Sequence, residues 1–323
     1  MAAESSAYGV DNKGNTVDAD GNIVWLFPDF LAQQIRRPSF CIICCRRYTS
    51  KNPREKEHIL PDWLLGLSST YDSEVTVPKS LTHRASTYKV PLCRDCNRRL
   101  GIKLEQPMSS AFRSGHEGIV ELINQRPEIV FQWLNLIYFK THYKDSFLVL
   151  HKGKGEKEYL DSDIEWETFF RTHAIARSVL FDIKIHKSII GSLKVFKIKD
   201  WQKATNVEYY DNLHWSSCWI RFEESVIFCS LKDSNVGQRV LSHEIYRSNG
   251  ALSYFEFLSV VAEFELCYRR MEVLRRLDIS FRTDDRRLMI GNSFDGPVKI
   301  KPLSEGERKF LLDHLFSDRL KRM

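Results

Sequence analysis

The sequence lacks long apolar runs and several short motifs that mark common enzyme classes. None of its 323 residues belongs to an uninterrupted apolar stretch of about 18 residues, so we expect no membrane-spanning helix. The opening residues, MAAESSAYGV, do not combine a basic segment with an apolar one, so we expect no secretory signal and a cytoplasmic location. The patterns G-x-S-x-G, G-x-x-x-x-G-K-[ST] and G-x-G-x-x-G are missing, which argues against serine hydrolases and common nucleotide-binding folds.

Low-complexity segments and a strong charge bias are missing as well. Lys and Arg together number 48 and Asp and Glu 42, which gives a net charge of +6. This mild excess permits binding to nucleic acid without requiring it. Hydrophobic residues make up 43% of the chain, which is ordinary for a globular protein, and the length allows two domains.

The eight cysteines fall into two kinds of surroundings. Five are clustered near two short segments: Cys41, Cys44, Cys45, Cys93 and Cys96. In a reducing compartment such clustering indicates metal ligands. The other three occur in apolar surroundings that are typical of buried thiols: Cys218, Cys229 and Cys267.

The stretch Cys41–Gly101 contains C-I-I-C, then E-H-I-L-P, then C-R-D-C-N. Structural zinc prefers four tetrahedral ligands, and a Cys-x-x-Cys turn supplies two of them. We therefore predict that a structural zinc ion is bound by Cys41, Cys44, Cys93 and Cys96. Cys45 could replace Cys44, but two intervening residues are the usual spacing. Reduced core thiols are the alternative, which the two matched pairs disfavour.

Glu57 and His58 stand between the two cysteine pairs. A histidine can take a proton from water near neutral pH, and oxygen ligands such as Glu and Asn suit Mg²⁺ or Mn²⁺. On a strand the two neighbouring side chains point to opposite faces, so both reach one site only at a bulge or strand end. A lone Glu-His pair is usually structural; its setting, with Asn97 directly after Cys96, makes it informative.

These residues resemble the HNH endonuclease family, a ββα-metal module of two strands and a helix around one catalytic divalent ion. Glu57-His58-Ile59-Leu60-Pro61 is similar to the family's E-H-I-x-P, and Cys93–Asn97 to its closing C-x-x-C-N. The resemblance implies that His58 is the general base and that Glu57 and Asn97 bind catalytic Mg²⁺ or Mn²⁺. It covers roughly residues 39–106.

One position departs from the family pattern. The family has an Asn at a middle position that helps to orient the base. In this sequence that position is Tyr88, with Ser86, Thr87 and His83 close by. The module could therefore be active with a different residue in this position, or weakened. After the last cysteine, three basic residues are expected to contact nucleic acid, with plain solvent exposure as the alternative: Arg98, Arg99 and Lys103.

We predict an α+β protein in three parts. Residues 1–38 would form a β-hairpin and a short helix packing on the module. Residues 39–106 would be the zinc-stapled HNH-type module. Residues 107–323 would form a larger α+β domain for substrate positioning, sensing or partner binding, with helices over 118–124, 127–143, 166–182, 252–277 and from 304, strands over 192–198, 218–222 and 225–231, and a charged loop over 151–158.

The leading hypothesis is a divalent-metal-dependent endonuclease that hydrolyses phosphodiester bonds, in DNA rather than RNA, with a role in bacterial antiviral defence or in a mobile element. The alternative is a catalytically weak, zinc-stapled module that binds nucleic acid or protein within a larger assembly. Residues 107–323 would then supply the trigger, a protein partner or a homo-oligomer contact. No membrane association is expected.

Overall fold

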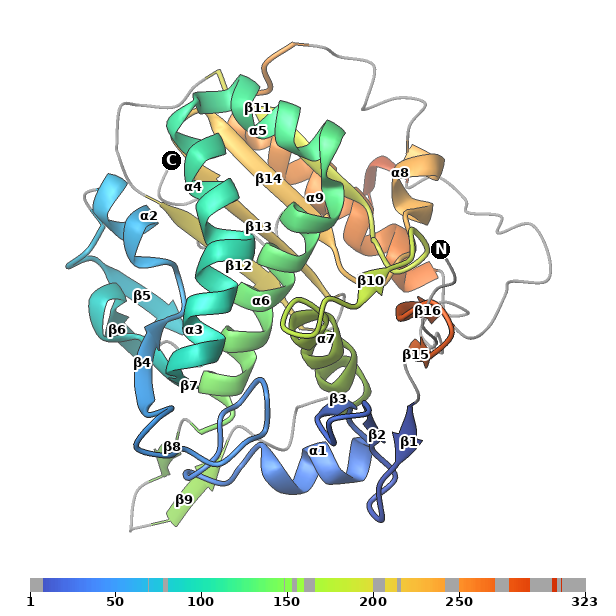
Figure 1. Ribbon diagram of the computed structural model, residues 1–323. Helices are drawn as coiled ribbons and strands as arrows, with labels where there is room; N and C mark the ends of the chain where they lie inside the picture. The colour runs from blue at the N-terminus through green and yellow to red at the C-terminus, as the bar shows by residue number, and fades with distance from the viewer. Residues whose placement is uncertain are drawn as a thin grey trace. The chain divides into compact units, whose positions relative to one another are not determined.

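The computed structural model (Figure 1) describes residues 8–68, 70–77, 81–147, 149–152, 156–159, 166–199, 207–213, 216–241, 250–270, 279–290, 304–306 and 309. These residues form a mixed α+β fold with several small sheets, which confirms the predicted class at that level. None of the helices in these ranges combines the length and apolar character needed to cross a membrane.

The chain packs into two compact units. The first consists of Met1–Ser110, Gln132–His186 and Ile279–Met289, and the second of Ala111–Phe131, Lys187–Asp278 and Ile290–Met323. Residues 132–186 therefore pack with the N-terminal third of the chain. Whether residues 1–38, 39–106 and 107–323 act as separate functional parts stays a prediction.

The first unit begins with a small antiparallel sheet of β1 (Gly9–Val10), β2 (Thr16–Val17) and β3 (Ile23–Trp25). The two turns between the strands are alike, because the carboxylates of Asp11 and Asp18 each accept backbone N–H groups two and four residues further along. This explains the repeated D-x-x-G-N pattern without a bound cation. Helix α1 (Pro28–Gln34) follows, with proline at its first position, as predicted.

The central motif lies on a two-stranded antiparallel sheet. β4 (Arg54–His58) pairs with β7 (Lys89–Cys93), and the register places His58 opposite Lys89. The helix α3 (Arg94–Leu100) begins immediately after β7 and includes Asn97. The segment joining the paired strands contains α2 (Asp62–Leu67), β5 (Glu74–Val77), β6 (Leu81–Arg84) and the 3₁₀ turn η2 (Ala85–Thr87).

Helical structure continues after α3 without an intervening loop. A π-helical turn, η3 (Gly101–Glu105), leads into α4 (Gln106–Arg113), and α5 (Gly115–Gln125) and α6 (Pro127–Asp145) follow. A π-turn widens the helix locally, and such turns are frequent at functional sites.

Two long helices form the core of the first unit. Helix α6 is apolar around most of its circumference, as expected for a helix buried on all sides. Its Phe139 ring lies 5.0 Å from the Phe169 ring of α7 (Trp166–Ser178), measured between centroids. The Asn135 amide donates a hydrogen bond of 2.7 Å to the carbonyl of Thr172. Both helices were predicted from their apolar spacing.

The predicted charged loop over residues 151–158 is wrong. Most of it belongs to an antiparallel hairpin of β8 (Val149–Lys152) and β9 (Glu156–Tyr159). Its glycines, 153 and 155, lie outside the described residues. The segment 151–158 lacks the alternation of apolar and polar residues by which strands are recognised, so its sequence favoured a loop.

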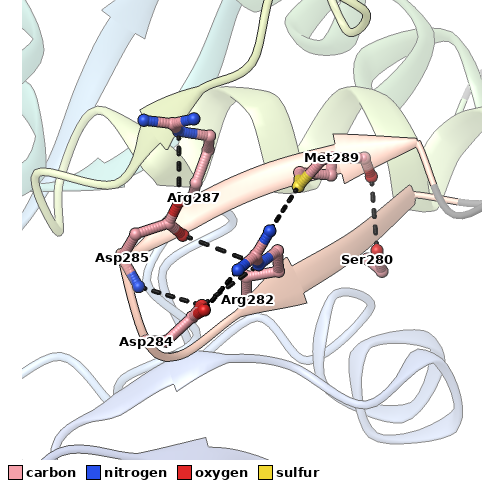
Figure 2. A network of polar contacts seen from close by, with 6 residues as sticks. All are labelled: Ser280, Arg282, Asp284, Asp285, Arg287 and Met289. Carbon is pink, nitrogen blue, oxygen red and sulfur yellow. Dashed lines mark hydrogen bonds and ion pairs between the residues drawn. The ribbon is translucent and has the colours of Figure 1, made fainter.

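A last small sheet of the first unit has the order β10-β16-β15, formed by β10 (Lys184–Ile185), β15 (Ile279–Arg282) and β16 (Arg287–Ile290). Figure 2 shows how polar side chains close the β15–β16 hairpin. The Arg282 guanidinium contacts both turn carboxylates, Asp284 and Asp285, and Arg287 pairs with Asp285 at 3.5 Å. Across the strands, Arg282 also lies 3.7 Å from the sulfur of Met289, and Ser280 donates to the Met289 carbonyl.

The second unit is built on a four-stranded antiparallel sheet covered by a helix. The strand order is β11-β14-β13-β12, and aromatic rings of the sheet pack against α9. The predicted strands are confirmed, and the elements are β11 (Leu193–Lys197), β12 (Glu208–Asn212), β13 (Ser217–Phe222), β14 (Ser225–Ser230), α8 (Val236–Leu241) and α9 (Tyr254–Arg270).

Two cysteines of the second unit, Cys218 and Cys229, are buried thiols, as predicted. Cys218 and Cys229 face each other in the β13–β14 register and are fully buried, and burial raises the pKa of both. The side chain of Cys267 lies outside the described set. So do the residues after 270 of the predicted long helix and nearly all of the helix predicted from Ser304.

Candidate metal centre and adjoining residues

The four predicted zinc ligands come together in the first unit. The sulfur atoms of Cys41, Cys44, Cys93 and Cys96 all lie within 4.8 Å of one another, and all four side chains are buried. The sulfurs of Cys44 and Cys93 are 3.8 Å apart. Zn–S bonds of about 2.3 Å at tetrahedral angles require sulfurs about 3.8 Å apart, so the cluster fits a structural zinc ion.

Local backbone geometry points the ligands inward. The N–H of Cys45 bonds the Cys41 carbonyl at 2.9 Å, closing a tight turn, and Cys45 itself has φ of 56°. With this left-handed backbone conformation at Cys45, Cys44 belongs to the cluster of four sulfurs and Cys45 does not. Cys93 caps the N-terminus of α3, where the helix dipole favours thiolate, and its N–H points at the Cys41 sulfur at 3.4 Å.

The choice between Cys44 and Cys45 is thus decided by the fold. Cys45 is not part of the cluster formed by the described residues, and burial raises the pKa of its thiol to about 12. A ligand must be a thiolate, so Cys45 is suited to remain a protonated core thiol. The pKa of Cys93 is lowered well below its usual range, because the neighbouring cysteine thiols donate to it.

A buried arginine holds the first cysteine turn in place. The guanidinium of Arg177 on α7 donates to the carbonyls of Ile43 at 2.9 Å and Val24 at 3.4 Å, and also to Ile23. His173, one helical turn earlier, contacts the Ile43 carbonyl at 3.0 Å, and burial lowers its pKa to about 3. Helix α7 therefore ties the cysteine turn to the N-terminal sheet.

His58 is the last residue of β4 and is 8% exposed. Its Nε2 lies 3.1 Å from the backbone carbonyl of Ser86, and its Nδ1 lies 3.5 Å from a carboxylate oxygen of Asp62. The hydroxyl of Tyr71 donates to the same Asp62 oxygen at 2.7 Å. Burial first, and then the charge of Lys89, lower the pKa of His58.

The middle position of the motif orients His58 through its backbone. Ser86, in the turn η2, provides the carbonyl that contacts the ring, so no asparagine side chain is needed for this contact. Tyr88 has another role, because its buried hydroxyl donates to Asp145 of α6, while its carbonyl accepts the N–H of Ile59.

Glu57 faces away from His58 along β4 and is paired with a lysine that the sequence did not suggest. The buried Lys140 ammonium of α6 lies 3.2 Å from Glu57 Oε1 and 2.6 Å from the His58 carbonyl. Glu105 lies beside Glu57. Burial raises the pKa of Glu105 to about 7, against the opposing effect of Lys140.

Asn97 contacts a different glutamate. Its amide donates to Glu55 Oε2 at 3.1 Å, and Arg94 pairs with the other oxygen of Glu55. Among the described residues, the four cysteines alone form a group of three or more cysteine, histidine or acidic side chains close enough to share an ion. Glu57 and Asn97 therefore contact different partners in this structure, Lys140 and Glu55.

The three basic residues predicted to contact nucleic acid differ in their surroundings. Arg98 is exposed on α3. Arg99 and Lys103 both pair with Asp182, Arg99 at 3.6 Å, and Lys103 also donates to the Val179 carbonyl at 3.0 Å. These contacts tie the α3–η3 helical segment to the end of α7. Binding of nucleic acid by these side chains stays a prediction.

No family model, curated protein or solved structure matches the chain.

Proposed function

We propose that the chain is an endonuclease of the HNH type that hydrolyses phosphodiester bonds in DNA, with His58 as general base. The observation that carries the proposal is the setting of His58. It ends the first of two paired strands, a helix follows the second strand, and four buried cysteines tie the helix start to a preceding turn. This order of elements agrees with the ββα arrangement that the motif resemblance implies.

The contacts of His58 suit a base. A carbonyl oxygen only accepts hydrogen bonds, so the nitrogen that contacts Ser86 must carry the ring proton. In the neutral ring, Nδ1 is then the basic nitrogen. Since the pKa of His58 is lowered, this form predominates at neutral pH. Asp62, held by Tyr71, lies on the Nδ1 side and would stabilise the imidazolium that forms.

The proposed step is proton transfer from water to His58 Nδ1 as the water oxygen attacks phosphorus. The bond between phosphorus and the leaving ester oxygen breaks, and the leaving oxygen acquires a proton from solvent. The resemblance assigns Mg²⁺ or Mn²⁺ to Glu57 and Asn97, but their contacts with Lys140 and Glu55 do not fit a preformed ion site. The step described here therefore uses protein groups and water only.

The decisive experiment is plasmid cleavage by the purified full chain with added Mg²⁺ or Mn²⁺. Replacing a general base reduces such reactions about 10²–10⁴-fold, and we expect this loss for His58→Ala. His116→Ala is the control, since the His116 ring also contacts a polar neighbour, Ser225, and burial likewise lowers its pKa. Both variants should retain zinc. Cleavage at wild-type rate by His58→Ala would refute the assignment.

A second function is favoured by one observation, the pairing of Glu57 with Lys140. An ammonium group already neutralises the carboxylate that a catalytic ion would need. In that case the chain binds nucleic acid or protein within a larger assembly and does not cut. Wild-type protein that binds DNA but fails to cut it with either metal would favour this function.

A further inference from the structure

We propose that a basic cavity on the His58 side of the two-stranded β4–β7 sheet binds the phosphate backbone of a nucleic-acid strand. This inference rests on the proposed function, because it names where the substrate lies relative to the base. The cavity belongs to the first unit and has a volume of about 530 Å³. No sequence motif indicated it.

The charge of the cavity has one sign. Five cationic side chains line it, and the described lining residues include no carboxylate: Arg36, Arg54, Lys56, Lys89 and Lys144. Among the described residues, the last four of these have no ion-pair partner. A concave site lined by charge of one sign focuses the electric field and concentrates ligands of the opposite charge, so this cavity attracts a polyanion.

The strand register connects the cavity to His58. Alternate residues of a strand share a face, so Arg54, Lys56 and His58 lie on one side of β4, opposite the side that carries Glu57. Lys89 is the direct partner of His58 across the ladder. Ser86 both lines the cavity and contacts the His58 ring.

The length of this row suits several consecutive phosphates. Four strand steps of about 3.3 Å separate Arg54 from His58, roughly 13 Å in total. Successive phosphates of one strand are at least about 3.4 Å apart, the rise along the duplex axis, so a row of this length can contact more than one phosphate. A phosphate chain laid along the row would bring one phosphodiester up to the base.

An aromatic ring distinguishes nucleic acid from other polyanions. Phe147 lines the cavity, is 42% exposed, and packs against Tyr143 at 4.9 Å between ring centroids. Grooves that bind single strands combine cationic side chains with exposed rings on which bases stack. An acidic peptide would use the cations but not the exposed ring face.

The experiment measures binding of fluorescent single-stranded DNA, duplex DNA and RNA by anisotropy, without added divalent ion, in the His58→Ala background. The test variant is Lys56→Gln/Lys144→Gln. The matched control is Lys51→Gln/Lys184→Gln, which removes two positive charges from exposed sites outside the cavity. Poly-glutamate serves as the non-nucleic-acid polyanion. Circular dichroism and zinc content verify folding.

We expect the test variant to bind the best nucleic acid about 15-fold more weakly at 0.15 M salt, because two contacts are lost and each contact to a single strand contributes about 4-fold there. The slope of log affinity against log salt should fall by about 1.4. Phe147→Ala should weaken binding by about 10-fold through lost stacking. The control should change affinity by less than about 2-fold.

Equal binding by test variant and wild type, or poly-glutamate binding as tightly as nucleic acid, would overturn the inference. If the double variant misfolds, lysine acetylation of the wild type replaces it. Bound DNA should protect Lys56 and Lys144 but not Lys51, and equal protection contradicts the inference. Cutting that is unaffected by cavity variants leaves the nuclease proposal intact, whereas cavity-dependent binding without cutting supports the cavity alone.

Discussion

Exchanging two neighbouring cysteines separately should give opposite results for zinc binding. Cys44→Ser removes a predicted ligand, whereas Cys45→Ser makes the same sulfur-to-oxygen change one residue later, outside the cluster. Both side chains are 6% exposed, so the two substitutions are matched in chemistry and burial. We expect the Cys45 variant to keep one zinc ion per chain and the Cys44 variant to lose it.

The stability difference can be estimated from the loop that the ion closes. Zinc joins Cys44 to Cys93, and cross-linking a loop of roughly 50 residues stabilises a fold by about 4 kcal/mol through the entropy of the unfolded chain. Loss of the ion should therefore cost about this much, with a further loss if the free thiolates repel one another. A buried Cys→Ser change outside the cluster should cost about 1–2 kcal/mol.

The assay combines zinc release, measured with a chromogenic chelator after thiol modification, with urea unfolding of each variant. Two results would refute the reasoning. One is a Cys45→Ser protein without zinc beside a Cys44→Ser protein that retains it. The other is wild-type protein, purified under reducing conditions, that contains no zinc.

Three further predictions concern groups elsewhere in the described structure. The cutting rate should fall as the pH drops below 6.5, because the lowered pKa of His58 leaves it neutral above that range; a pH profile showing a fall only above pH 7 would contradict this. Burial raises the pKa of Glu265 to about 8 from 4.5, so the folded chain holds a proton there that the unfolded chain has released, and the free energy of unfolding should drop between those pH values by roughly 5 kcal/mol. Glu265→Gln should flatten that dependence in urea titrations, and an unchanged slope would argue against it. Arg177→Met should lower the free energy of unfolding, measured in urea, by about 3–5 kcal/mol, because three backbone carbonyls lose their donor. A loss below about 1 kcal/mol would contradict the role of Arg177 in holding the first cysteine turn.

Sequence patterns were sufficient where the physical cause is local. Two Cys-x-x-Cys spacings predicted the ligands, since each pair is set by one tight turn. Apolar spacing predicted α6 and α7, since a helix repeats every 3.6 residues regardless of its neighbours. The hairpin β8–β9 was missed because charged residues and two glycines dominate the segment 151–158 and favoured a loop.

The sequence by itself predicted the cluster of four cysteines and most helical and strand segments of the core. Only the tertiary structure decided that Cys45 is excluded, that a Ser86 carbonyl holds the ring, and that Lys140 pairs with Glu57. Only the tertiary structure also brings Arg36, the β4–β7 sheet and α6 together around the basic cavity. These contacts join residues far apart in the chain, and packing sets their distances, so local propensity carries no information about them.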